Sequence, residues 1–268
     1  MTIAQNRLKT IALATCIALA APNAFAQAFD AVRLYGAAPG KDGGTFGAAV
    51  VAGYAYQGSD EQSTLVIPVL DYQWANGWFA GVTNGIGYNF SNSPQTQYGL
   101  RVTADRGRKE SRSSALRGMG DVDPAAEVGG FFNYSLPEGL FFTSSVRYGA
   151  GADHKGLVTD LGAGYLTEIA PKWHLAAGAG ITLANANYLQ SFFGVTGAQS
   201  AASGYAVHTA GSVARDVRAN VALTYSIDEK ISVTAALSAS SLLGGAKHSP
   251  LTRKPTSGSG VVGITYAF

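Results

Sequence analysis

The sequence predicts an all-β protein, a transmembrane antiparallel β-barrel of 10–12 strands of the Gram-negative outer-membrane type. Charged residues make up only 13% of the chain, about half the share typical of soluble domains, while 47% of residues are hydrophobic. The apolar residues alternate with small and polar ones, and after the first 26 residues no apolar run approaches the length of a membrane-spanning helix. The last segment, 258–268, alternates strictly and ends in an aromatic residue. Together these observations favour a barrel over a soluble domain or a helical membrane protein.

The N-terminal segment is typical of a cleaved secretory signal peptide. Arg7 and Lys9 form a short positive region, residues 11–21 are apolar but too short to span a bilayer, and Ala24-Phe25-Ala26 fits a cleavage site. The predicted organisation is therefore a signal peptide of residues 1–26, a flexible N-terminal lead of residues 27–44 and an outer-membrane barrel of residues 45–268.

Cysteine content and charge exclude several classes of function. Cys16 lies inside the expected signal, so the mature chain would have no disulfide and no thiolate metal site. Lipid attachment at Cys16 is the alternative, and Thr15 is a poor residue before such a site. Without Arg7 and Lys9 the mature chain has 17 basic and 17 acidic residues. A net charge near zero gives no reason to expect nucleic-acid binding.

Twelve segments alternate with the period of a strand. In order they are 46–56, 64–74, 78–90, 98–105, 128–136, 140–148, 157–169, 173–183, 205–212 (the weakest), 217–227, 231–237 and 258–268. On the closing segment Val262, Ile264, Tyr266 and Phe268 share one face, which we expect to meet lipid, and Val261, Gly263, Thr265 and Ala267 share the other. Small changes on the second face, at Gly263 or Thr265, are expected to be mild. Tyr266 and Phe268 are the expected assembly signal, read by the barrel assembly machinery.

The turns lead to a different strand count. Asn76-Gly77 is the strongest hairpin signal, and further short turns are expected at 137–139, 171–172 and 228–229. Short turns face the periplasm in such barrels, so an even number of strands should separate them. Dropping 98–105 and 205–212 satisfies this condition and leaves ten strands. Aromatic residues flank the turns and are expected to form a periplasmic girdle: Trp74, Trp78, Tyr134, Trp173 and Tyr225.

No pattern in the sequence indicates a catalytic, cofactor or metal site. The four histidines are not at metal-ligand spacing, and no serine lies in a nucleophile elbow. The segment 118–123 resembles part of a calcium loop but lacks its remaining ligands. The basic run 106–112 could contact lipopolysaccharide phosphates, although a solvated loop is slightly favoured. We therefore expect no enzyme and no cofactor.

The polar residues on the inward faces of the strands are the most informative candidates. Both signs of charge occur among them, so they could hold the interior of the barrel together or line a narrow polar pathway. The candidate lumen residues are Arg101, Asp105, Glu127, Arg147, Asp160, Glu168, Arg218 and Asn220.

The mature chain resembles the MipA/OmpV family of outer-membrane proteins, named after an MltA-interacting protein. The motifs that carry the resemblance are short, but their order and spacing are fairly specific. They are Tyr54-Ala55-Tyr56-Gln57-Gly58-Ser59-Asp60, Ile67-Pro68, Asn76-Gly77-Trp78-Phe79, Gly118-Met119-Gly120-Asp121-Val122-Asp123, Asn187-Tyr188, Ser191-Phe192-Phe193-Gly194-Val195, Ser249-Pro250-Leu251 and Tyr266-Ala267-Phe268.

The resemblance implies a non-enzymatic role in the outer membrane. It implies a scaffold for peptidoglycan-remodelling enzymes. The expected protein partners are a lytic murein transglycosylase and a penicillin-binding synthase. Outer-membrane lipid and lipopolysaccharide are expected to surround the barrel. Two alternatives remain open: a narrow pore or uptake channel for small solutes including antibiotics, which the inward charges motivate, and a surface adhesin acting through its external loops.

Overall fold

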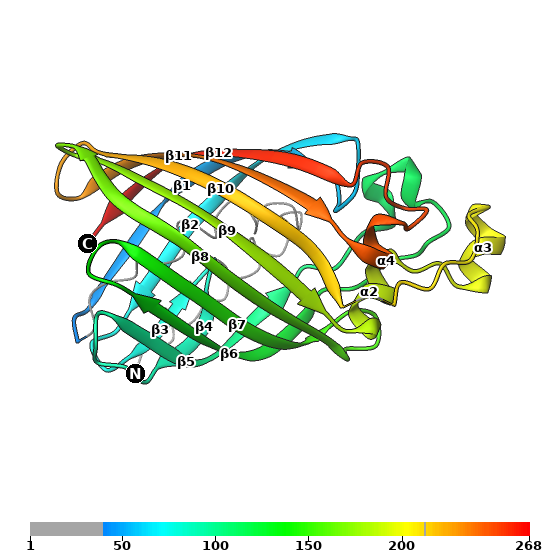
Figure 1. Cartoon of the computed structure of the whole chain (residues 1–268), viewed down its shortest axis with the longest axis horizontal. Coiled ribbons are helices and arrows are strands. Elements are labelled where there is room, and N and C mark those ends of the chain that lie inside the picture. Colours follow the sequence, from blue (N-terminus) through cyan, green and yellow to red (C-terminus); the bar gives the residue numbers. More distant parts are fainter. Residues whose placement is uncertain (1–39, 212) are drawn as a thin grey trace, which may run out of the picture.

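A computed structural model describes residues 40–211 and 213–268, which form a closed barrel of twelve antiparallel strands (Figure 1). The strands are β1 Gly43–Tyr54, β2 Gln62–Gln73, β3 Trp78–Gly81, β4 Gly85–Asn89, β5 Thr96–Asp105, β6 Ala125–Ser135, β7 Leu140–Ala150, β8 Gly156–Ala170, β9 Trp173–Ala184, β10 Ala214–Ser226, β11 Ile231–Leu242 and β12 Thr256–Ala267. Each strand pairs with its neighbours in sequence, and β1 pairs with β12 to close the cylinder. The predicted signal peptide and residues 27–39 of the predicted lead lie outside the described residues, and β1 begins at Gly43.

The barrel has the twelve strands of the segment count, but two of the segments behave differently from the prediction. The segment 78–90 forms two short strands, β3 and β4, which pair with each other across a tight turn. In the segment 205–212, residues 205–211 form no strand, and His208 makes only an isolated bridge with Val195. Residue 212 lies outside the described residues. The ten-strand alternative was wrong because 98–105 lies within β5.

The predicted turn parity holds once the segment 78–90 counts as two strands. The four short turns then lie at one end of the barrel, together with the β4–β5 connection 90–95. We call this the turn end. The other end, the loop end, has the long connections 106–124, 185–213 and 243–255 and all the labelled helices of Figure 1. Because short turns face the periplasm in outer-membrane barrels, the loop end faces outward.

The two faces of each strand differ as the alternation predicts. On β12, Val262 and Ile264 are 57% and 50% exposed, whereas Val261 is 5% exposed. Large apolar side chains cover the outer surface of the other strands in the same way. The inward face is tighter than expected at Gly263, where an added Cβ would lie 3.0 Å from the Ala49 Cβ. A serine at this position would require Ala49 to shift by a few tenths of an ångström.

Aromatic rings gather on the outside of the barrel at the turn end. The rings of Trp173 and Tyr225 are 4.7 Å apart, and those of Trp78 and Tyr88 are 5.5 Å apart. The terminal Phe268 stacks on Tyr72 at 5.9 Å. Such a belt is typical of the membrane–water interface.

On one side of the barrel the strands β3 and β4 are short, and the strands next to them are paired over only part of their length. β2 pairs with β1 along its full length but with β3 at only three residues, Asp71–Gln73. β5 pairs with β4 only at 99–102. On the loop-end side of the β3–β4 hairpin, no strand of the described residues pairs with β2 or β5 in the space between them. Pro68, which has no N–H to donate, lies on this stretch of β2 and suits an incompletely paired strand.

Within residues 40–211 and 213–268, no helix is long and apolar enough to cross a bilayer.

A substitution on each face of β12 should show which face meets lipid. Ile264→Arg places a charge on the lipid-facing surface, which costs about 2–4 kcal/mol near the bilayer midplane. Thr265→Ser, one residue away on the inward face, should change stability little. Urea titration after folding into lipid vesicles measures both. Equal losses would mean that the register of the closing strand is wrong.

The terminal residue should be needed for assembly. The backbone N–H and carbonyl of Phe268 each bond to Gly44 at 3.0 Å, and its ring lies 5.9 Å from that of Phe46. Phe268→Asp would place a charge beside this interfacial aromatic cluster, so we expect impaired barrel assembly, while Phe268→Tyr should assemble normally. Heat-modifiable migration in unboiled gels measures assembly. A wild-type pattern for Phe268→Asp would contradict the assembly role.

Candidate functional site

Polar and ionic side chains from six neighbouring strands, β5 to β10, meet inside the barrel near the loop end. We call this set the lumen belt. Its members are Thr103, Glu127, Arg147, Asp160, Thr182, Arg215, Asp216 and Arg218.

Arg147 on β7 joins two carboxylates of the lumen belt. Its Nη2 donates to Asp160 Oδ2 at 2.6 Å, and its Nη1 lies 3.5 Å from Glu127 Oε2. The same Glu127 oxygen accepts a hydrogen bond from Thr103 Oγ1 at 3.2 Å. Glu127 is only 2% exposed, so these partners offset the cost of burying its charge.

Asp160 on β8 connects the belt to β9 and β10. Its Oδ1 accepts from Thr182 Oγ1 at 2.9 Å and from Arg218 Nη2 at 3.3 Å. The Nη1 of Arg218 in turn lies 3.6 Å from Asp216 Oδ1. The ionic groups of the belt therefore hold one another across the strands, an arrangement that fixes the interior of the barrel.

A β-bulge adds a residue that alternation does not predict. The register of β9 against β10 shifts between Ala214 and Asp216, so that Arg215 and Asp216 are both buried. Arg215 pairs with Asp216 through Nε and Oδ2 at 2.5 Å, and its Nη1 donates to Tyr188 Oη at 2.9 Å. Two adjacent charges directly before the predicted strand 217–227 are the signal that could have revealed the bulge.

The predicted lumen residues are not all in one place. Four of them meet in the lumen belt: Glu127, Arg147, Asp160 and Arg218. Asp105 lies at the loop end of β5, where its Oδ1 accepts from the Gly107 N–H at 2.7 Å. The other three lie apart from the belt.

Those three residues differ in their surroundings. The guanidinium carbon of Arg101 lies 5.7 Å from the centre of the Phe131 ring. Asn220 is half-buried on the inward face of β10, and Glu168 is exposed near the turn end of β8. Among the described residues, no hydrogen bond or ion pair links the Glu168 side chain to the belt. Glu168 is therefore a suitable reference position on the same strand as Asp160.

The long connections of the loop end form a folded cap. It contains two short 3-10 helices, Glu110–Arg112 and Ser114–Leu116, and the α-helices α2 Ala186–Phe193, α3 Gly197–Ser203 and α4 Gly244–Lys247. α2 begins at the N-cap Asn185, whose side chain accepts from the Tyr188 N–H at 3.0 Å. Its apolar side chains, Leu189, Phe192 and Phe193, pack with strand ends and α4 in one buried cluster.

Hydrogen bonds join the connections of the cap to one another. Tyr56 Oη donates to the Leu251 carbonyl at 2.9 Å, and Ser249 Oγ donates to the Phe193 carbonyl at 2.6 Å. Gln199 Nε2 donates to the Met119 carbonyl at 2.7 Å. Burial raises the pKa of Tyr56 to about 12, so its hydroxyl keeps the proton that it donates. The cap is therefore one interlocked body.

The motifs of the family resemblance, far apart in the sequence, largely meet in this cap. Tyr56, Met119, Tyr188, Phe193 and Leu251 come from five of them, and each is buried there. A signal spread over nearly 200 residues of sequence thus corresponds to one compact structure.

The acidic side chains of the turn 118–123 form ion pairs within the cap. Lys109 Nζ bonds to Asp121 Oδ2 at 2.9 Å and to Asp123 Oδ1 at 3.0 Å, and the bond from Lys109 holds the pKa of Asp121 below its usual value. In the described ranges, no group of three or more metal-binding side chains is assembled.

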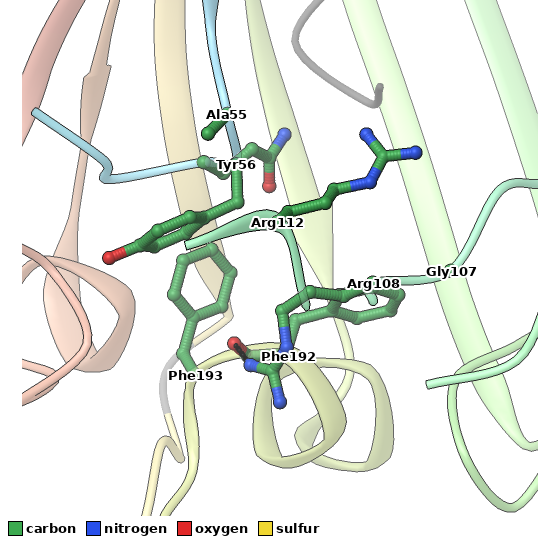
Figure 2. A pocket seen from close by; sticks show the side chains of 8 residues that line it. Ala55, Tyr56, Gly107, Arg108, Arg112, Phe192 and Phe193 are labelled. Carbon is green, nitrogen blue, oxygen red and sulfur yellow. Dashed lines mark hydrogen bonds between the residues drawn. The ribbon is translucent and has the colours of Figure 1, made fainter. Parts of the chain in front are cut away.

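A small pocket lies where the β1–β2 connection, the β5–β6 connection and α2 meet (Figure 2). About 350 Å³ of space lies among its lining residues, counting the part that is open to solvent. Its lining residues are Ala55, Tyr56, Gln57, Gly107, Arg108, Arg112, Phe192 and Phe193. No sequence pattern groups these residues, because the pocket exists only where three separate connections meet.

The lumen belt should contribute measurably to stability. Asp160→Ala removes a shared partner of Arg147 and Arg218 and leaves them only the longer contacts to Glu127 and Asp216. Breaking a buried ion pair by removing one partner costs about 3–5 kcal/mol. Glu168→Ala, on the same strand, should stay within about 0.5 kcal/mol of wild type. Urea unfolding in lipid vesicles compares the two. Similar values for both would show that the belt does not stabilise the barrel.

Comparisons with known proteins supply a family. Among solved structures, the NanC porin aligns with a TM-score of 0.46 and 12% identity over 82% of this chain and 98% of its own. The KdgM porin aligns with a TM-score of 0.45 and 10% identity, covering 84% and 99%. The Pseudomonas putida toluene transporter TodX aligns with a TM-score of 0.40 and 11% identity, covering 91% and 93%.

No curated protein sequence matches the chain. The family described as MltA-interacting protein MipA matches residues 46–268, which is nearly the whole described barrel and cap. The closed twelve-stranded barrel, its apolar outer surface and this match place the protein in the outer membrane, and the chain belongs to the MipA family.

Proposed function

We propose that this protein is a non-enzymatic docking platform in the outer membrane for a lytic murein transglycosylase, and through it for a peptidoglycan synthase. The observation that carries the proposal is membership of a family described by its interaction with MltA. The geometry adds a connected body, because the barrel is closed, the lumen belt ties six strands together and the cap interlocks over the loop end.

The turn end is the surface that such a partner would meet. By the rule of short periplasmic turns, it is the end that faces the peptidoglycan. It exposes acidic and basic side chains on rigid turns, among them Glu138, Glu229 and Lys172. Lys172 Nζ also donates to the Ile227 carbonyl at 2.9 Å, which joins two neighbouring turns into one surface.

A narrow conduit for small solutes is the second candidate, and the charged lumen favours it. Arginines and carboxylates from several strands face the interior, as in a polar pathway. Their mutual pairing and the cap above them argue for low conductance. Stable conductance steps of the purified protein in planar bilayers would support the conduit, and silent bilayers would favour the platform.

Charge reversal at the turn end should weaken docking. We expect the purified barrel in nanodiscs to bind the soluble transglycosylase of the same bacterium saturably. Glu138→Lys combined with Glu229→Lys should lower this affinity at least about fivefold and change its salt dependence, because rim charges steer association. The matched control reverses two exposed carboxylates of the loop end, Asp60→Lys with Asp153→Lys, and should bind like wild type.

Surface plasmon resonance at two salt concentrations measures all three proteins. Absence of binding by the wild-type barrel would contradict the platform. Equal weakening by both double variants would move the docking surface away from the turn end.

A further inference from the structure

One buried cation in the cap has unused hydrogen-bonding capacity. Arg108 lies in the β5–β6 connection and is only 5% exposed. Its Nη1 donates to the Phe192 carbonyl at 2.7 Å. Its Nε and Nη2 are buried and have no hydrogen-bond partner in the part of the chain that the structure describes.

The charge of Arg108 is also left without a close counter-charge. No ion pair forms between Arg108 and a carboxylate of the described residues, and Asp121 and Glu110 act on it only from a distance. Burial lowers its pKa from the ordinary value, which reflects the cost of an uncompensated charge. Because buried charges in proteins are normally paired, a guanidinium in this state indicates an anion that is not part of the chain.

The pocket beside this guanidinium suits one kind of anion. The rings of Phe192 and Phe193 supply the apolar part of the lining (Figure 2). Gln57 and Arg112 are its other polar lining residues, from the β1–β2 and β5–β6 connections. A ligand with one charged end and a short apolar remainder matches both parts. Inorganic phosphate would leave the aromatic wall without a partner.

We propose that the cap pocket binds the carboxylate of a short organic acid through the Nε and Nη2 of Arg108. These two N–H groups lie side by side on one edge of the guanidinium and match the two oxygens of a carboxylate. The apolar part of the acid packs against Phe192 and Phe193. Both nitrogens are buried in this structure, so binding includes a side-chain rotation in the wall of the pocket.

Butyrate is the probe, and calorimetric titration of the purified full barrel in detergent measures its binding. We expect saturable binding of butyrate, no binding of the neutral isostere butyramide and at least tenfold weaker binding of inorganic phosphate. Binding of butyramide as tight as that of butyrate would overturn the carboxylate assignment, and so would phosphate binding as tight as butyrate. Absence of butyrate binding would overturn the site itself.

Two variants and a control locate the site. Arg108→Gln should weaken butyrate binding at least about tenfold, the loss expected for a charge-assisted bidentate bond. Gln57→Glu should also lose binding, because it supplies a carboxylate within the pocket, while its thermal midpoint stays at or above that of wild type. Arg117→Gln, at an exposed arginine of the same connection, should bind normally.

The second variant keeps the test decisive if Arg108→Gln fails to fold. Normal butyrate binding by Gln57→Glu would overturn the proposal. Normal binding by a folded Arg108→Gln barrel would do the same, because the acid would then be held elsewhere.

Discussion

The closed ladder of backbone hydrogen bonds is the constraint on which the rest of this structure depends. A strand in hydrocarbon has no water to satisfy its N–H and carbonyl groups, so each edge must find another strand. Pairing of β1 with β12 closes the cylinder, and Phe268 and Gly44 complete that pairing at the chain terminus. Closure then fixes which faces meet lipid and which meet one another. The lumen belt and the cap are built on the geometry that closure provides.

The period of the strands could be predicted from the sequence, and so could most of their positions. Alternation at Val261 and Val262 correctly separated the inward from the lipid-facing side. The split of segment 78–90 was missed, although a second Asn-Gly pair, Asn84-Gly85, lies inside it and Gly85 adopts a φ of +75°. A dipeptide that favours a tight turn was hidden within a run of apolar residues that otherwise read as one strand.

The inward charges could be predicted in part, from the alternation of residues along the strands. Alternation places Glu127 and Arg147 on the inner face, but it cannot anticipate the bulge that turns both Arg215 and Asp216 inward. The structure of the cap could not be predicted from local sequence patterns. The hydrogen bond from Tyr56 to Leu251 joins residues 195 positions apart, and no local pattern encodes such a contact. Only the family resemblance pointed to these segments, without indicating that they meet.

The short β3–β4 hairpin is the part of the closed cylinder with the fewest ladder pairs. Around most of its circumference, neighbouring strands share long ladders, whereas β2 shares only three residue pairs with β3. A load on the barrel, from a change in bilayer thickness or from a protein pulling on the turn end, will concentrate at this seam. The barrel can widen there without breaking a long ladder, so the seam sets the compliance of the whole cylinder.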